Sequence, residues 1–341
     1  MITSMHIENF KCFKDFDIEL GPFNVLIGPN DSGKTALLQA ILLPSVFRGG
    51  GDTLSLAHVK DQLSVDLGTE ILHGGISAAK PMIAIAQVSP DGIQDQIVVR
   101  SDHPTGKRWR VGSEGNSSRA YPPLGKVSQC QFDPSRLREP VELSHGLDRD
   151  GLGVPAFLAR LSLNHPEARD SLQDAFRRKF PFYTGVKTIP QREGNADALH
   201  LRFPTIQKQE LPAASVSDGL MVSLGFLAIA HDPEPPSILL VEEPENHVHH
   251  ASLKDIVGTL KHLSADKGVQ VILTTHSPYL LDCVRPEEVH VFAKDEEGAV
   301  HSRKLSDHPE VEGLKKHFMT GEIWTGLEEE EDFLEKLRGS K

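Results

Sequence analysis

One eight-residue segment, GPNDSGKT at Gly28 to Thr35, constrains the fold of this chain more than any other feature. It overlaps the end of the short apolar run FNVLIG, and KTALLQAILLPSVF follows with helical spacing of its apolar residues. A glycine-containing loop between a buried strand and a helix turns backbone N–H groups and a helix N-terminus toward phosphates. The sequence therefore predicts an α/β fold that carries a phosphate-binding loop at the end of a strand.

The side chains of this loop have separate expected roles. Lys34 supplies a positive charge to the β- and γ-phosphates, and the hydroxyl of Thr35 ligates Mg²⁺. Asp31 stands where a third glycine would adopt the turn conformation with less strain, but Asp adopts left-handed backbone conformations more readily than most residues. We expect the nucleotide to contact Asn30, Asp31, Ser32, Gly33, Lys34, Thr35 and Ala36.

A second motif, SILLVEEPENHVHH, is an apolar run that ends in two carboxylates. We expect Glu242 to hold Mg²⁺, mostly through water, and Glu243 to act as general base on the attacking water. The histidines at 247, 249 and 250 raise the alternative of a metal site, but no further ligand pattern supports it.

Two further motifs follow the same logic. In VILTTHSPYLLD a strand leads to His276, which can sense the γ-phosphate or the attacking water by hydrogen bonding. In SVSDGLMVSL, Ser217 takes the N-cap position of a helix that runs to Ala230, with Asp218 and Gly219 after it. A helix N-terminus with a hydroxyl and a glycine is a second phosphate-binding device.

The rest of the chain predicts three kinds of region. PMIAIAQVS, DQIVVRS and KRWRVG are expected to form antiparallel strands; helices broken by Pro166 and Pro181 follow, and ALHLRFP and TIQKQEL return to strand. Two expected strands, ILLVEE and VQVILTTH, are separated by a helix expected from about His250 to Ser264. This alternation of strand and helix is typical of a parallel sheet flanked by helices. We expect one domain over 1–341, built from an N-terminal lobe (1–135), a helical and strand insertion (136–210), a C-terminal lobe (211–305) and an acidic tail (306–341).

Composition narrows the class of protein. The formal net charge of −12 argues against a surface that broadly coats DNA, although residues 154–209 carry nine Lys/Arg against five Asp/Glu. No apolar run reaches the roughly 20 residues that span a bilayer, and MITSMHIENFKCF lacks the pattern of a signal peptide. Three cysteines without a CxxC pair favour reduced thiols. A cytoplasmic protein is expected.

Taken together, these motifs resemble an ABC-type ATPase head of the RecF/SMC branch. The segments IENFKCFKDFDIEL, FNVLIGPNDSGKT, SDGLMVSL, LLVEEPENHVHH and VILTTHSPYLLD are most similar to stand-alone ATPases of the OLD family. The resemblance covers roughly residues 1–45 and 211–295, and the middle matches only in layout. It implies an ABC-type P-loop fold with a mainly parallel sheet, an antiparallel β lobe and an inserted helical lobe.

The resemblance also implies a composite site. Such heads dimerise head to tail around two ATP molecules, so Ser217 would act on the partner's nucleotide, and Asn246 and His247 would lie in the loop that crosses the interface. Lys11 corresponds to a basic position near the nucleotide. A glutamine after the antiparallel strands senses Mg²⁺; both Gln129 and Gln131 fit, and we include Gln131 in the predicted metal set. Gln39 is expected to be structural.

Departures from the family are informative. Glu242 stands where transporter heads carry Asp, no coiled-coil arm interrupts the chain, and residues 277–341 are too few for the TOPRIM nuclease domain that follows in OLD proteins. A nuclease is therefore expected on a separate chain. MTGEIWTGLEEEEDF resembles the C-terminal end of short ATPases found beside nucleases or toxins in anti-phage defence systems.

The function expected is that of an ATP-hydrolysing switch that closes as a homodimer and controls a separate effector, a nuclease or toxin. The alternative is a RecF-like, ATP-gated DNA-binding protein whose contact surface is the basic stretch 154–209. A small-molecule kinase is disfavoured by SDG ahead of LLVEEPE, and a transporter ATPase by the long span between Lys34 and Glu242.

Overall fold

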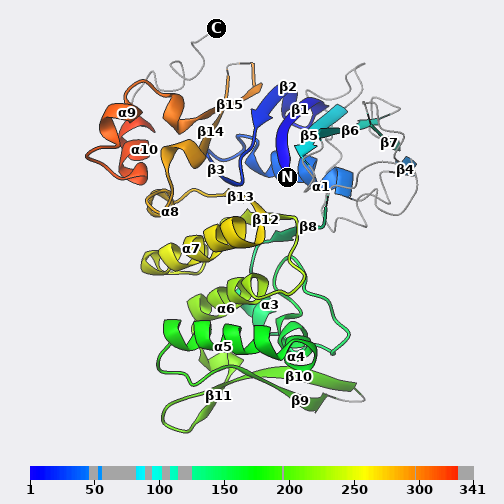
Figure 1. Cartoon of the computed structure of the whole chain (residues 1–341), viewed down its shortest axis with the longest axis vertical. Helices are drawn as coiled ribbons and strands as arrows, with labels where there is room; N and C mark the ends of the chain where they lie inside the picture. Colours follow the sequence, from blue (N-terminus) through cyan, green and yellow to red (C-terminus); the bar gives the residue numbers. More distant parts are fainter. Residues whose placement is uncertain are drawn as a thin grey trace. The chain divides into compact units, whose positions relative to one another are not determined.

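The computed structural model describes residues 1–45, 53–55, 82–88, 94–101, 108–113, 125–193, 196–295 and 297–328. Contacts between residues divide the chain into two compact units, and Figure 1 shows the whole chain. The first comprises Met1–Val127, Ser237–Leu240 and Gly268–Lys341, and the second Ser128–Pro236 and Val241–Lys267. The division into lobes at 135, 210 and 305 stays a prediction, and residues 329–341 of the predicted tail lie outside the described residues.

A six-stranded sheet carries the predicted phosphate loop. Its order is β15 (Val300–Lys304), β14 (Val289–Lys294), β3 (Phe23–Ile27), β13 (Gln270–Thr274), β12 (Ile238–Glu242) and β8 (Val127–Cys130). Strand β3 pairs in parallel with both β13 and β14, whereas β15 runs antiparallel to β14. Every residue of β3, β12 and β13 is buried, as expected for parallel strands covered on both faces. The predicted mainly parallel sheet is confirmed.

Helix α1 (Lys34–Ser45) begins directly after the loop. Ten of its 12 residues are buried, because its sequence is apolar almost all round. Leu37 and Ile41 belong to a core cluster with Leu26 of β3 and Phe292 of β14. This packing ties the helix to the strand that precedes the loop, and so fixes both ends of the loop.

The predicted antiparallel strands are also confirmed. Their sheet has the order β2 (Phe13–Glu19), β1 (Ile2–Phe10), β5 (Met82–Val88), β6 (Gln94–Ser101), β7 (Arg108–Ser113) and β4 (Thr53–Ser55). Strands β1 and β2 form a hairpin with Phe10 opposite Phe13, and its turn places Lys11 in the left-handed region, at φ 53°. Buried residues of both strands join the core that contains α1.

The second unit is mainly helical. It holds α3 (Pro134–Arg138), α4 (Val154–Asn164), α5 (Pro166–Lys179), α6 (Asp218–Ala230) and α7 (His250–Lys267). Helix α6 is apolar on all sides and packs against the other four, and Figure 1 shows α4 and α5 beside the small antiparallel sheet of β9 (Lys187–Glu193), β10 (Ala196–Pro204) and β11 (Glu210–Pro212). TIQKQEL was expected as a strand; the chain instead turns at Lys208, at φ 63°, and only Glu210–Pro212 is strand.

The first unit also contains the short helices α8 (Pro278–Leu281), α9 (Val311–Leu314) and α10 (Thr320–Glu328). Helix α10 packs against α8, which lies within the predicted His276 motif. Among the residues described, no helix combines the length and apolar character that a membrane span requires.

Candidate nucleotide-binding site

Two glycines shape the phosphate loop. Gly28 has φ 148°, and a Cβ there would lie 2.2 Å from the carbonyl oxygen of Phe292. Gly33 has φ 103°, and a Cβ there would lie 3.1 Å from Sγ of Cys12. Both backbone conformations are costly for residues with a side chain, and at Gly28 the space is closed by rigid backbone. The loop keeps this path only with glycine at both positions.

Lys34 and Asp31 take different environments in this loop. The Lys34 ammonium is buried and donates to the carbonyl oxygens of Gly28 and Pro29, at 2.8 Å each. Asp31 has φ 62°, the left-handed conformation expected for it, and its carboxylate lies 2.6 Å from Nζ of Lys294. The loop therefore holds a charged amine inside its own curve and places an ion pair at its rim.

The other predicted nucleotide contacts lie in the loop and at the start of α1, and they differ in exposure. Asn30 and Thr35 are exposed, whereas Ser32 is buried. Lys11 donates through Nζ to Oε1 of Gln39 on α1. The hairpin turn of β1 and β2 is thus linked to α1, and the structural role expected for Gln39 is a link to that turn.

The acidic end of β12 carries a hydrogen-bonded group of oxygen and nitrogen atoms. Glu242 is 7% exposed, and Gln129 donates through Nε2 to its Oε1. Arg149 lies with Nη2 2.6 Å from the same oxygen and 2.6 Å from Oε1 of Gln131. Gln129 therefore contacts Glu242 directly, and Gln131 reaches it through Arg149. Carboxylate and amide oxygens are the ligands that Mg²⁺ prefers, so this donor set fits that ion.

Arg149 was not found from the sequence. It lies in the loop between α3 and α4, where no motif marks it. Lys294, the partner of Asp31, was missed as well, because it ends a strand, β14, that the motifs did not include. Only the fold brings these two cations to the predicted site residues.

Glu243, the predicted general base, has strained backbone. Its φ of 44° is unusual for a residue with a long side chain, and such outliers persist where surrounding contacts enforce them. Asn246 supplies two of these contacts: its backbone N–H donates to the Glu243 carbonyl at 3.0 Å, and its Nδ2 donates to Glu243 Oε2 at 2.9 Å. The carboxylate of Glu243 is thereby held in one orientation.

The predicted signature segment forms the start of α6. Ser217 is the N-cap and accepts a hydrogen bond from the Leu220 N–H at 3.3 Å. Arg138 forms an ion pair with Asp218 at 2.6 Å. A Cβ on Gly219 would lie 3.6 Å from the carbonyl oxygen of His247. The helix start thus lies beside the Asn246–His247 loop, as two parts of one surface of the second unit.

His276 follows β13. The Thr275 N–H donates to the Leu26 carbonyl at 3.0 Å, which extends the contact between β13 and β3 to the residue before His276. Ser277 donates its N–H to Oγ1 of Thr275 at 2.9 Å, and the His276 side chain is exposed. The strand that supplies His276 is therefore the neighbour of the strand that supplies the phosphate loop.

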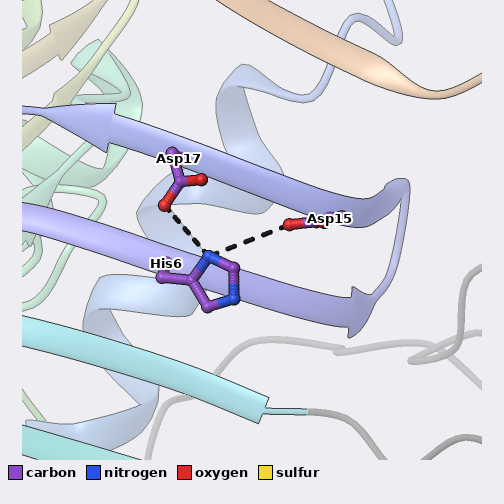
Figure 2. A group of neighbouring side chains, drawn as sticks. All are labelled: His6, Asp15 and Asp17. Carbon is purple, nitrogen blue, oxygen red and sulfur yellow. Dashed lines mark hydrogen bonds and ion pairs between the residues drawn. The ribbon is translucent and has the colours of Figure 1, made fainter.

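A separate polar cluster lies on the exposed face of the β1–β2 hairpin (Figure 2). His6 Nδ1 is 2.9 Å from Asp17 Oδ1 and 3.8 Å from Asp15 Oδ1, and its Nε2 is 3.0 Å from Glu8 Oε1. The hydrogen bond with Glu8, and then the bond and charge of Asp17, hold the pKa of His6 above its usual value. His6 pairs across the strands with Asp17, a register that residue spacing does not reveal. When the imidazole is protonated, it forms ion pairs with these carboxylates.

Two family models match the chain. Residues 1–47 match a model described as an AAA ATPase domain, and residues 133–282 match one described as AAA domain, putative AbiEii toxin, Type IV TA system. The two matches contain all the predicted site residues except Gln129 and Gln131.

Two curated proteins are similar in sequence. The OLD nuclease of Thermus scotoductus is 23% identical over 361 residues, which cover 94% of this chain and 68% of that protein. The DNA replication and repair protein RecF of Erwinia tasmaniensis is 33% identical over 85 residues, covering 25% of this chain and 22% of that protein.

Solved structures show the same fold. An Smc head bound to the C-terminal winged-helix domain of ScpA has a TM-score of 0.63 at 15% identity, covering 90% of this chain and 99% of the head. An Smc head domain with an extended coiled coil, bound to the C-terminal domain of ScpA derived from Pyrococcus furiosus, has a TM-score of 0.60 at 15% identity, covering 92% and 99%. The expected ATPase-head fold is confirmed.

Proposed function

Because the chain is an ABC-type ATPase head of the RecF/SMC type, related in sequence to the OLD nuclease, we propose that it binds Mg²⁺ and ATP and hydrolyses ATP as a molecular switch. In this proposal Lys34 binds the phosphates, Thr35 and Glu242 hold Mg²⁺, Glu243 is the general base and His276 contacts the γ-phosphate.

The observation that carries this proposal is the order of three strands. Strands β3, β13 and β12 are consecutive in the sheet. The phosphate loop follows β3, His276 follows β13, and β12 ends at Glu242, directly before Glu243. Ligands of open α/β sheets bind outside the carboxyl ends of the strands. In this proposal the phosphate loop neutralises the charge of the phosphates, Glu242 and Glu243 bind the metal and activate the water, and His276 contacts the γ-phosphate.

We further infer that the switch is a head-to-tail homodimer. Ser217 and Asp218 are exposed at the start of α6, which is 13 residues long, and its N-terminal N–H groups favour an anion. Asn246 and His247 are exposed beside that helix start. A γ-phosphate contacted by both subunits would bind the closed dimer more tightly than the monomer, and a ligand shifts an equilibrium only through such a difference in affinity.

The test uses the base variant Glu243→Gln, which keeps the size of the side chain and one oxygen that can accept from Asn246. With Mg²⁺ and ATP we expect this variant to accumulate as a dimer in mass measurements, and wild type to hydrolyse ATP and return to monomer. Ser217→Arg in the Glu243→Gln background is the matched control: it should still bind ATP but stay monomeric. A Glu243→Gln chain that stays monomeric with ATP, alongside wild type that does not hydrolyse it, contradicts the proposal.

The output of the switch is proposed to be control of a separate effector protein, a nuclease or toxin of an anti-phage defence system in the cytoplasm. The support is the relation to the OLD nuclease and the match to a model that names a toxin of a toxin–antitoxin system. Affinity purification of the Glu243→Gln chain with ATP tests this. An effector should co-purify in a ratio that changes when ATP is omitted.

A RecF-like DNA-binding function is the second candidate, because residues 154–209 are locally basic. Within this stretch, however, Arg169, Arg177, Lys179 and Lys187 form ion pairs with carboxylates, and Arg160 donates to two backbone carbonyls. A mobility shift with ATP and a salt titration decides between the two functions. Binding that weakens steeply with salt favours DNA, and no binding at about 50 mM salt removes this candidate.

A further inference from the structure

Arg149 forms an ion pair with the carboxylate that is proposed to hold Mg²⁺. Its Nη2 lies 2.6 Å from Oε1 of Glu242, and the same nitrogen lies 2.6 Å from Oε1 of Gln131. The Gln131 N–H donates to the Arg149 carbonyl oxygen at 2.9 Å, so the backbone of the Arg149 loop is held beside Gln131. The guanidinium is therefore positioned by its own backbone as well as by the acid.

The ion pair with Arg149 compensates the charge of the buried Glu242 carboxylate. Glu242 is 7% exposed, and a buried carboxylate is unfavourable unless a cation and hydrogen bonds compensate it. Gln129 supplies a hydrogen bond without charge, whereas Arg149 supplies both.

The side chain of Arg149 has more freedom to move than that of Glu242. Its side chain is 32% exposed, and it lies in the loop between α3 and α4 rather than within a helix or strand. Glu242, by contrast, is fixed at the end of a fully buried strand. If one partner moves, it is the arginine.

The geometry points to Arg149 as an internal cation that competes with Mg²⁺ for Glu242, and so sets the metal concentration at which the nucleotide site loads. This inference rests on the proposed function, since it assigns Glu242 to the metal. A guanidinium at Oε1 of Glu242 occupies one oxygen of this carboxylate and repels a divalent cation that approaches it. Mg²⁺ held by Glu242 would therefore bind more weakly while the guanidinium stays in place.

The first experiment measures metal dependence without relying on turnover. Thermal unfolding of wild type and Arg149→Gln is followed at increasing Mg²⁺ with a fixed amount of a non-hydrolysable ATP analogue. Arg149→Gln should reach half of its stabilisation at about 10-fold lower Mg²⁺, equivalent to a difference of about 1.4 kcal/mol. Arg149→Lys should resemble wild type more closely, because it keeps the charge. Arg160 donates to the Leu143 and His145 carbonyl oxygens and provides the matched control: Arg160→Gln should leave the midpoint unchanged.

An unchanged or higher Mg²⁺ midpoint in Arg149→Gln overturns the inference, because it would mean that Arg149 assists loading. A double-variant cycle of Arg149→Gln and Glu242→Gln, measured without nucleotide or metal, checks the ion pair itself. We expect Arg149→Gln alone to lower the melting temperature and the double variant to recover most of the loss; additive losses contradict the pair. If no variant and no wild type bind the analogue, the proposed function fails, and competition with Mg²⁺ fails with it, whereas the cycle still decides the ion pair.

Discussion

Asn246 donates its side-chain Nδ2 to Oε2 of Glu243 at 2.9 Å and its backbone N–H to the Glu243 carbonyl at 3.0 Å, across a turn in which Glu243 has φ 44°. A residue expected to bridge subunits thus also orients the predicted general base. This relationship links closure of the proposed dimer to chemistry, since a partner that contacts Asn246 would act on Glu243 directly.

Asn246→Ala should lower kcat for ATP about 10-fold and leave the affinity for nucleotide unchanged. Positioned bases contribute about 10²- to 10⁴-fold to a rate, and a base that loses its orienting bond retains part of this effect. Steady-state hydrolysis and equilibrium binding of a fluorescent ATP analogue measure the two quantities. Glu243→Gln serves as the reference for complete loss of the base, and wild-type turnover in Asn246→Ala would show that this bond does not matter.

Gly28→Ala should destabilise the chain and abolish nucleotide binding, since its Cβ would meet the Phe292 carbonyl oxygen at 2.2 Å and its φ of 148° is strained for alanine. Gly258→Ala is the matched control. Gly258 lies inside α7 with open space around its Cβ position, so this change should stabilise the chain by about 0.5–1 kcal/mol. Thermal unfolding of both variants gives opposite shifts if the loop geometry is correct.

His290 should make the chain sensitive to acid. Burial, followed by the charge of Lys304, lowers its pKa to about 4. As pH falls below about 6.5, His290 becomes protonated in the unfolded state, whereas in the folded state it stays neutral down to about pH 4. The free energy of unfolding therefore falls across that window by on the order of 3 kcal/mol. Above about pH 6.5 this contribution is constant.

Denaturant unfolding at several pH values checks this expectation. His290→Gln should lose stability less steeply between about pH 6.5 and 4 than wild type. Equal slopes in the two proteins would mean that other groups dominate acid unfolding.

Local signals made much of this fold predictable. The phosphate loop, the N-cap at Ser217 and the fully apolar runs of β3, β12 and β13 each lie within a short window, and their structure follows from turn, capping and burial preferences in that window. The turn between β1 and β2 depends on a left-handed Lys11, which a sequence pattern does not specify.

What could not be predicted depends on register between distant segments. Arg149 reaches Glu242 across 93 positions and Lys294 reaches Asp31 across 263, and neither pairing leaves a spacing pattern. The choice between Gln129 and Gln131 was open for the same reason, since both follow the antiparallel strands and only three-dimensional placement separates their contacts. Strand β14 beside β3 was missed because no motif marked it.

Asp31→Gly should leave the chain folded and tighten nucleotide binding by about fivefold at low salt. The φ of 62° suits glycine better than aspartate, and the lost partnership with Lys294 costs little, because Asp31 is 91% exposed and exposed ion pairs contribute about 0–1 kcal/mol. Removing a negative charge from the rim of a phosphate loop, and releasing the Lys294 ammonium from it, both favour a polyphosphate. Equilibrium binding of a fluorescent ATP analogue at low and high salt measures the effect, which should shrink as salt screens the charges. Asp31→Asn separates charge from backbone, since it removes the charge and keeps a side chain that tolerates this φ. Weaker binding in both variants would show that the Asp31 carboxylate itself assists the nucleotide.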